Sequence, residues 1–210
     1  MGTVLVLPDL ASPLEGWHHL NVGHRELRIA DYRELNGESG DFDQVTEATI
    51  SLVRKLPQPV ILVGHGFGAF LALNVATTQF GRLDRLMLIT PMYQAKKRLV
   101  LSNGIRFKSK GSFKTTALDK AATSQLVKST VDRDLTNQLM HVQCRTDIFC
   151  GEQDRRHKQQ AEDLYHRLLE GHLTMVPQMD TQLASETFNA LNEILRWNRF
   201  TWNLLRKGLV

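Results

Sequence analysis

A pentapeptide in the first third of the chain constrains its fold more than any other feature. Residues 64–68 read Gly-His-Gly-Phe-Gly and follow an uninterrupted apolar run over 60–63. The glycines have the spacing of the Gly-x-Ser-x-Gly frame, in which a buried strand turns sharply into a helix and exposes the middle residue above the sheet. Here the middle residue is Gly66, which carries no hydroxyl. The pentapeptide therefore predicts a strand–turn–helix unit and leaves open whether the chain catalyses anything.

Apolar patterning on both sides of the pentapeptide predicts strands that alternate with helices. We expect strands at 4–7, 26–32, 60–63, 85–90, 141–150 and 173–176, and helices at 42–56, 67–79, 157–170 and from 185 onward. Such alternation favours right-handed βαβ units. The predicted fold class is α/β, with a mostly parallel sheet of about six strands between two layers of helices.

Composition is typical of one globular domain spanning residues 1–210. No apolar run approaches the ~20 residues that a membrane-spanning helix needs. The apolar start of the chain has no basic segment and stops at Pro8-Asp9, so we do not expect a signal peptide. The two cysteines, Cys144 and Cys150, lie too far apart along one extended segment to form a disulfide. A reduced cytoplasmic protein without metal or cofactor is the expectation.

Positive charge is concentrated in residues 92–140, which hold ten Lys/Arg against three Asp. This segment interrupts the strand–helix alternation between the fourth and fifth strands. We expect it to form a small basic cap over the carboxyl edge of the sheet, where open α/β folds bind ligands. A solvated face is its simplest interpretation. Its few aromatic residues accompany no nucleic-acid motif, so we do not expect nucleic acid as a partner.

With these parts in order, nearly the whole chain resembles the α/β-hydrolase family. Residues 4–10 are similar to the strand and loop that carry the family's oxyanion hole, although Pro8-Asp9 replaces the usual His-Gly pair. Residues 29–33 are similar to the next strand and its Asp-x-Arg turn. Residues 62–69 match the family's nucleophile elbow at every position except the nucleophile. The resemblance implies a three-layer α/β-hydrolase fold.

The same resemblance identifies the positions of a catalytic triad. Residues 147–154, which end in Gly-Glu-Gln-Asp, resemble the segment that presents the catalytic acid, and the acid is then Asp154. The family's histidine is expected near 178–181, where Met179 and its neighbours stand, and no histidine follows His172. Two of the three triad positions, Gly66 and Met179, therefore lack the required side chain.

Acyl transfer by such a triad needs a nucleophilic oxygen, an imidazole that takes its proton and an acid that orients the imidazole. Gly66 supplies no nucleophile, and a serine restored there would still lack its base. Glycine also relieves the strained positive-φ conformation of the elbow, which costs about 1–3 kcal/mol for a residue with a Cβ. The leading hypothesis is a catalytically degenerate member of the family.

One part of the family's active site, the backbone N–H groups of the oxyanion hole, does not depend on these side chains. The backbone N–H groups of Leu10 and Phe67 are expected to converge at the start of the helix after the elbow, which favours anions and carbonyl oxygens. His65 is expected to pack behind the elbow. Leu10, His65, Gly66 and Phe67 are therefore the predicted lining of a pocket for a small acyl or carboxylate ligand that is bound but not cleaved.

Two alternatives remain open from the sequence. One is an active hydrolase or lyase that uses an unconventional residue, for which the candidates are His18, His19, Asp9 and Asp154. The other is a protein-interaction subunit with a closed pocket. In that case the basic cap, or a C-terminal helix rich in aromatic and cationic residues, would contact a protein partner or a second copy of the chain. An interfacial membrane helix is a further interpretation of that tail.

Three acidic residues keep open roles at this stage. Asp154 is expected to cap the following helix or to pair with Arg155 or Arg156 in the absence of a triad histidine. Asp147 lies within an apolar strand, so either the strand begins later or the carboxylate has a specific partner. Asp180 stands beside the empty histidine position and is a candidate pocket residue.

Overall fold

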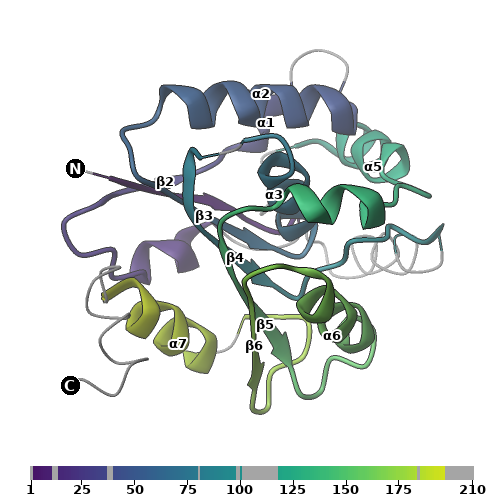
Figure 1. The fold of residues 1–210 in the computed structure, drawn as a ribbon. Helices are drawn as coiled ribbons and strands as arrows, with labels where there is room; N and C mark the ends of the chain where they lie inside the picture. Colours follow the sequence, from purple (N-terminus) through teal and green to yellow (C-terminus); the bar gives the residue numbers. More distant parts are fainter. Residues whose placement is uncertain are drawn as a thin grey trace.

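A six-stranded, fully parallel sheet forms the centre of the molecule (Figure 1). The computed structural model describes residues 2–10, 14–36, 40–79, 81–97, 100, 118–183 and 185–196. The strands lie in the order β2-β1-β3-β4-β5-β6. Their bounds are β1 Thr3–Leu7, β2 Glu26–Ile29, β3 Val60–His65, β4 Leu83–Ile89, β5 Arg145–Gly151 and β6 Gly171–Val176. The predicted fold class is confirmed.

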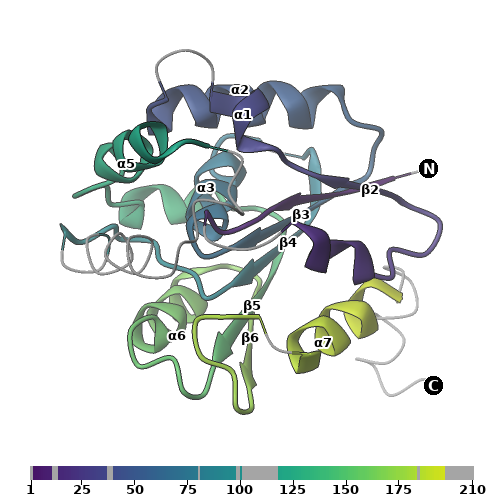
Figure 2. The same cartoon turned by 180° about the vertical axis from the view of Figure 1, so that it is seen from behind.

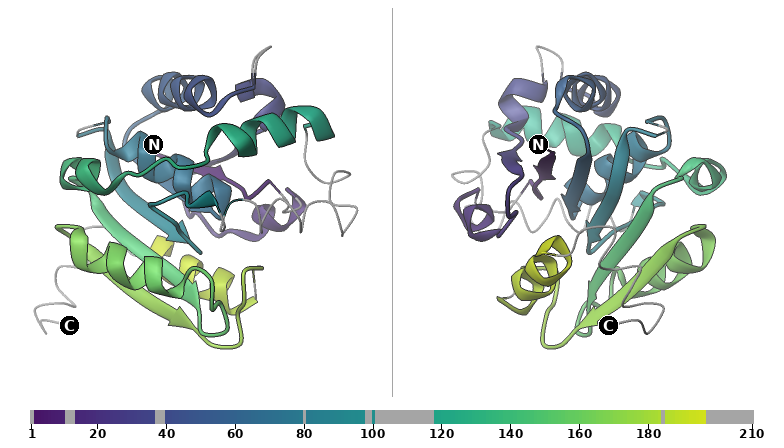
Figure 3. Two further views of the ribbon diagram at one scale, coloured as in Figure 1. Left: turned by 90° about the vertical axis from the view of Figure 1, so that its right-hand side faces the viewer. Right: turned by 60° about the vertical axis from the view of Figure 1, so that its left-hand side comes forward.

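Helices cover both faces of this sheet (Figures 1 and 2). Six α-helices and two 3-10 helices lie in the described part: η1 Glu15–His19, α1 Tyr32–Asn36, α2 Phe42–Lys55, α3 Phe67–Ala76, α5 Lys120–Ser129, η3 Thr136–His141, α6 Lys158–Arg167 and α7 Ser185–Arg196. Side chains of α1, α2, α3, α5 and α6 join the hydrophobic core on one face. Those of η1 and α7 join the core on the other face. Figure 3 shows the resulting three layers.

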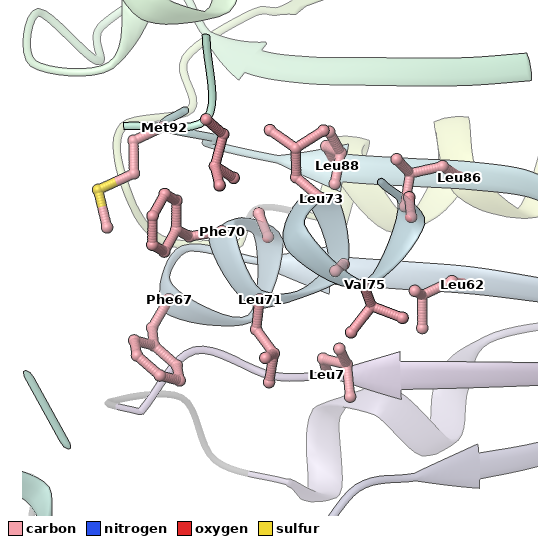
Figure 4. Packing of buried hydrophobic residues seen from close by; sticks show 14 of the residues in the cluster. Leu7, Leu62, Phe67, Phe70, Leu71, Leu73, Val75, Leu86, Leu88 and Met92 are labelled. Atoms are coloured by element: carbon pink, nitrogen blue, oxygen red, sulfur yellow. The ribbon is translucent and has the colours of Figure 1, made fainter. Parts of the chain in front are cut away.

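The helix after the elbow is the centre of the larger core. Nine of the ten residues of α3 are buried, so the helix is apolar on all sides, as expected for one enclosed between a sheet and other helices. Figure 4 shows Leu71 and Val75 of α3 beside Leu7 of β1 and Leu62 of β3. This packing fixes the start of α3, and with it the elbow, against the carboxyl edge of the sheet.

Several element boundaries differ from the predicted ones for local reasons. The strand expected over 26–32 ends at Ile29 because the Asp31 carboxylate accepts the Arg33 N–H at 2.8 Å and Tyr32 begins α1. The strand expected over 141–150 begins at Arg145, because the preceding residues form η3. Hydroxyl and carboxylate acceptors near a chain reversal commonly end a strand in this way.

The buried strand carboxylate has specific partners. Asp147 is 3 % exposed on β5, and its side chain lies 3.1 Å from the Arg145 guanidinium and 3.5 Å from that of Arg85. The strand therefore does not begin later than Asp147, and the carboxylate is paired. Both cysteines are free thiols, with Cys150 on β5 and Cys144 immediately before it.

Part of the segment predicted as a cap packs onto the larger core. Its helix α5 begins at Lys120, where the Asp119 side chain accepts the Ala122 N–H at 2.7 Å. The Ser129 hydroxyl accepts the Phe42 N–H at 2.9 Å and so joins α5 to the start of α2. Residues 101–117 of the predicted cap and the tail beyond 196 lie outside the described residues. In the described part no helix is both long and apolar enough to cross a membrane.

Candidate site at the glycine elbow

The elbow has the strand–turn–helix geometry that the pentapeptide predicted. β3 ends at His65, α3 begins at Phe67, and Gly66 between them has φ 54° and ψ −114°. A residue with a Cβ adopts this conformation only under strain. A Cβ at Gly68 would lie 1.9 Å from the Leu7 carbonyl oxygen. Gly66 is therefore required by the backbone angle, and Gly68 by the approach of β1.

The Asp9 carboxylate occupies the position of the missing nucleophile. Its Oδ1 accepts the Phe67 N–H at 2.9 Å. A Cβ built on Gly66 would lie 2.5 Å from the same oxygen and 2.7 Å from the Asp9 Cγ. The carboxylate thus fills the volume of a side chain at position 66 and takes one of the first N–H groups of α3, at the positive end of the helix dipole.

Little space remains above the elbow. Leu10, the second predicted N–H donor, is fully buried. The cavity that the described residues frame at this place has a volume of about 20 Å³, and its lining consists of Asp9, Leu10, Phe67, Met92, Val100, Val127 and Thr130. A volume of this size holds about one water molecule. The four residues predicted to line a ligand pocket do lie together, but a carboxylate of the chain itself is among them.

His65 lies behind the elbow, as predicted. It is 1 % exposed, its ring centroid is 6.1 Å from that of Trp17, and its Nε2 lies 3.2 Å from the Thr181 carbonyl oxygen. Burial lowers the pKa of His65, and the nearby Asp9 carboxylate only partly opposes this effect. A neutral imidazole that donates its Nε2–H to the Thr181 carbonyl satisfies both observations.

Asp154 stands just after β5 and contacts a histidine. The carboxylate is 2 % exposed, and its Oδ2 lies 2.8 Å from the Nδ1 of His157. The Asp154 Oδ1 also accepts the backbone N–H groups of Arg156 and His157, each at 3.1 Å. The expectation was that Asp154 would cap the following helix or pair with Arg155 or Arg156. Its N–H partners instead belong to the turn before α6, whose N-cap residue is His157, and its side-chain partner is the ring of His157.

The sequence interpretation missed His157. The imidazole was expected near 178–181 or, in the alternative, at His18 or His19. The available signal was the Asp-x-x-His spacing ahead of a helix, which places residues i and i+3 on one side of a helical turn. The His157 Nδ1 and the Asp154 carboxylate lie within ion-pair distance, at 2.8 Å.

The pKa of the Asp154 carboxyl is lower than its ordinary value. Burial alone would raise it, but hydrogen bonds and charge from His157, together with backbone N–H groups, outweigh burial. Because its folded-state pKa is depressed, ionised Asp154 contributes stability that is complete above the unfolded-state pKa of about 3.9. That contribution disappears as the pH falls through the folded-state value.

Replacement of Asp154 tests this linkage. At pH 7 we expect Asp154→Asn to lower the free energy of unfolding by about 1.5–3 kcal/mol, the usual range for a hydrogen bond to a charged group. The difference between wild type and variant should stay constant from pH 7 to 5 and shrink below about pH 4. Denaturant unfolding across this range measures it. A difference that grows as the pH falls would contradict the assigned pKa direction.

The predicted position of the triad histidine is part of the core. Met179 is 1 % exposed and packs in the core beneath α7, where its sulfur lies 2.9 Å from the Thr187 hydroxyl. Its carbonyl accepts the Gln153 N–H at 3.1 Å. The next residue, Asp180, is exposed, and its side chain accepts the Gln182 N–H at 2.7 Å. This segment therefore supplies packing and a turn rather than a base.

The other histidine candidates lie elsewhere. His18 and His19 are exposed on η1, which packs on the face of the sheet opposite α5. His172 lies on β6. Two of the unconventional candidates have contacts of interest: Asp9 lies at the elbow, and Asp154 contacts the buried imidazole of His157. Within the described ranges no group of His, Cys, Asp and Glu is arranged to hold a metal ion.

Comparison with known proteins agrees with this architecture. Residues 4–180 match the model of the alpha/beta hydrolase family, so the chain belongs to that family. No curated protein matches the sequence. A lipase-esterase related protein from Clostridium acetobutylicum superposes with a TM-score of 0.72 at 12% identity, over 93% of this chain and 94% of that one. A hydrolase from Oleispira antarctica gives 0.72 at 14% identity, over 97% and 92%.

A third similar structure is an N-formylmaleamic acid deformylase from Pseudomonas putida, with a TM-score of 0.69 at 12% identity over 91% of this chain and 92% of that one. These identities are low, so the three likenesses establish the fold and leave the reaction to be argued from the site.

Proposed function

We propose that this chain is a non-hydrolytic member of the α/β-hydrolase family that acts by binding. One observation carries the proposal: the Asp9 carboxylate fills the nucleophile's volume and accepts the Phe67 N–H. A Ser-type acyl-enzyme needs a hydroxyl at position 66 and a free donor for the developing oxyanion. Here the hydroxyl is absent and the donor is already used.

The same contact changes which ligand the elbow favours. A carboxylate ligand would have to displace Asp9 from the Phe67 N–H and would meet a like charge on the way. A small acyl or carboxylate ligand is therefore a weaker proposal than a macromolecular partner bound elsewhere on the surface. In this proposal the elbow is a structural junction, stabilised by a side chain that caps α3.

Two measurements on the wild-type chain test the proposal. A panel of activated esters and a fluorophosphonate probe should show neither turnover nor labelling above background, with a catalytically active α/β-hydrolase as the positive control. Titration with acetate and butyrate should leave the amide resonance of Phe67 unchanged in the wild type. In Asp9→Gly the freed N–H should respond to both acids.

Asp9→Asn is the matched control, because it keeps the size and the acceptor oxygen but removes the charge. We expect it to resemble the wild type in both assays. Ester turnover by the wild-type chain that disappears in Asp9→Asn or Asp154→Asn would overturn the proposal. It would favour the alternative in which an unconventional carboxylate does the chemistry.

A further inference from the structure

The contact between Asp154 and His157 fixes the state of the imidazole. The carboxylate can only accept, so at 2.8 Å from Oδ2 the His157 Nδ1 carries the proton. The unprotonated nitrogen of a neutral ring is then Nε2. This is the relation between acid and imidazole in a serine hydrolase triad, where the acid holds Nδ1–H and leaves Nε2 to take a proton.

Nε2 of His157 is the ring nitrogen without a hydrogen-bond partner among the described residues. Within the described part of the chain, the ring's hydrogen-bond contacts are those of Nδ1 with Asp154. The side chain is only 5% exposed, so the ring is almost enclosed and Nε2 is its remaining acceptor.

The pair also lies on the elbow side of the sheet. Asp154 follows the carboxyl end of β5, the edge at which β3 passes into the elbow. His65, adjacent to Gly66, has Asp9, His157 and Asp154 as its charged neighbours. Two carboxylates and two imidazoles therefore share one region at the carboxyl edge of the sheet, beside the start of α3.

We propose that His157 has taken the place of the family's missing histidine, so that the site retains an oriented imidazole–carboxylate pair and lacks only a nucleophile and the room for one. The inference rests on the proposed function in one respect: both hold that the chain is inactive because Asp9 blocks the elbow. The ligand class is an activated carboxylic ester or a phosphonate that a serine oxygen can attack.

The double variant Asp9→Gly/Gly66→Ser supplies both missing parts. Asp9→Gly restores the residue of the family's His-Gly pair and clears the space that a Cβ at position 66 needs. With p-nitrophenyl acetate, the new serine oxygen would bond to the carbonyl carbon while His157 Nε2 takes the hydroxyl proton. The bond to the p-nitrophenol oxygen then breaks, and His157 gives its proton to that oxygen, so that p-nitrophenol leaves and Nε2 is a base again. Water, deprotonated by the same nitrogen, would next attack the acetyl carbonyl; the bond to the serine oxygen breaks, that oxygen takes the proton back from Nε2, and acetate leaves.

The experiment compares fluorophosphonate labelling and p-nitrophenyl acetate turnover across three proteins. Asp9→Gly/Gly66→Ser should be labelled and should turn over the ester. Addition of His157→Gln should lower both rates about 100-fold or more, the usual contribution of a general base. Addition of His166→Gln, at an exposed position of the following helix α6, should leave both rates unchanged.

Labelling that is insensitive to His157→Gln would overturn the inference, as would a folded double variant, verified by circular dichroism, that is not labelled. If the double variant does not fold, the wild-type chain still decides the matter. Nitrogen-15 spectra of its histidines should show His157 as the Nδ1–H tautomer with an unprotonated Nε2. The Nε2–H tautomer would exclude the proposed role. Ester turnover by the wild type would contradict the proposed function without affecting this assignment.

Discussion

Gly66→Ser should destabilise the protein by about 2–6 kcal/mol rather than restore a hydrolase. Two costs combine. A residue with a Cβ at φ 54° is strained, at about 1–3 kcal/mol. Its Cβ would also approach the Asp9 carboxylate to 2.5 Å, and overpacking of this kind costs about 1–3 kcal/mol. Denaturant unfolding measures the loss, and the same samples should show no ester turnover.

Gly66→Ala is the control for this variant. It adds the Cβ without the hydroxyl, so we expect nearly the same destabilisation. A serine variant that is much more stable than the alanine variant would show that the hydroxyl finds a favourable partner at the elbow. Efficient esterase activity from Gly66→Ser alone would show that Asp9 moves aside without cost.

Gly68→Ala should have the larger effect, a loss of more than about 4 kcal/mol that leaves little folded protein. Its Cβ would lie 1.9 Å from the carbonyl oxygen of Leu7 and 2.7 Å from that of Pro8. Both are backbone atoms of β1 and the segment that follows it, so no side chain can turn away. Relief requires α3 to separate from the sheet, and α3 is the centre of the larger core.

The matched control is Gly16→Ala, on η1. Its Cβ would find one atom at 4.0 Å, on the Phe188 ring, which is ordinary contact. We expect a change of less than about 0.5 kcal/mol, as for surface substitutions in general. Equal effects at the two positions, measured by thermal or denaturant unfolding, would mean that close approach of β1 is not what requires Gly68.

Apolar periodicity was sufficient to predict the sheet, because each strand and helix buries one face or both. The β3–α3 unit followed from its glycine spacing, and six strands were expected where six occur. Boundaries depended on side-chain acceptors such as Asp31 and Asp119, whose roles a hydrophobic pattern does not contain. The start of β5 shifted because a 3-10 helix precedes it.

The site was less predictable, because its contacts join residues far apart in the chain. Asp9 and Phe67 are 58 positions apart, and only the pairing of β1 with β3 brings them together. The elbow motif predicted that the Phe67 N–H would be a donor for an anion or a carbonyl oxygen. It did not predict that the Asp9 carboxylate would accept this hydrogen bond. His157 is only three positions from Asp154, but it stands well before the family's own histidine position, so the resemblance did not indicate it.

A double-mutant cycle between Asp9 and Gly66 tests the central claim, that Asp9 occupies the nucleophile's place. Asp9→Gly alone should cost about 0.5–2 kcal/mol through loss of the cap on α3. Combined with Gly66→Ser it should instead recover stability, so that the double variant is at least about 1 kcal/mol more stable than the sum of the single effects. Additive effects would contradict the account, because they would mean that the two positions do not share the same space.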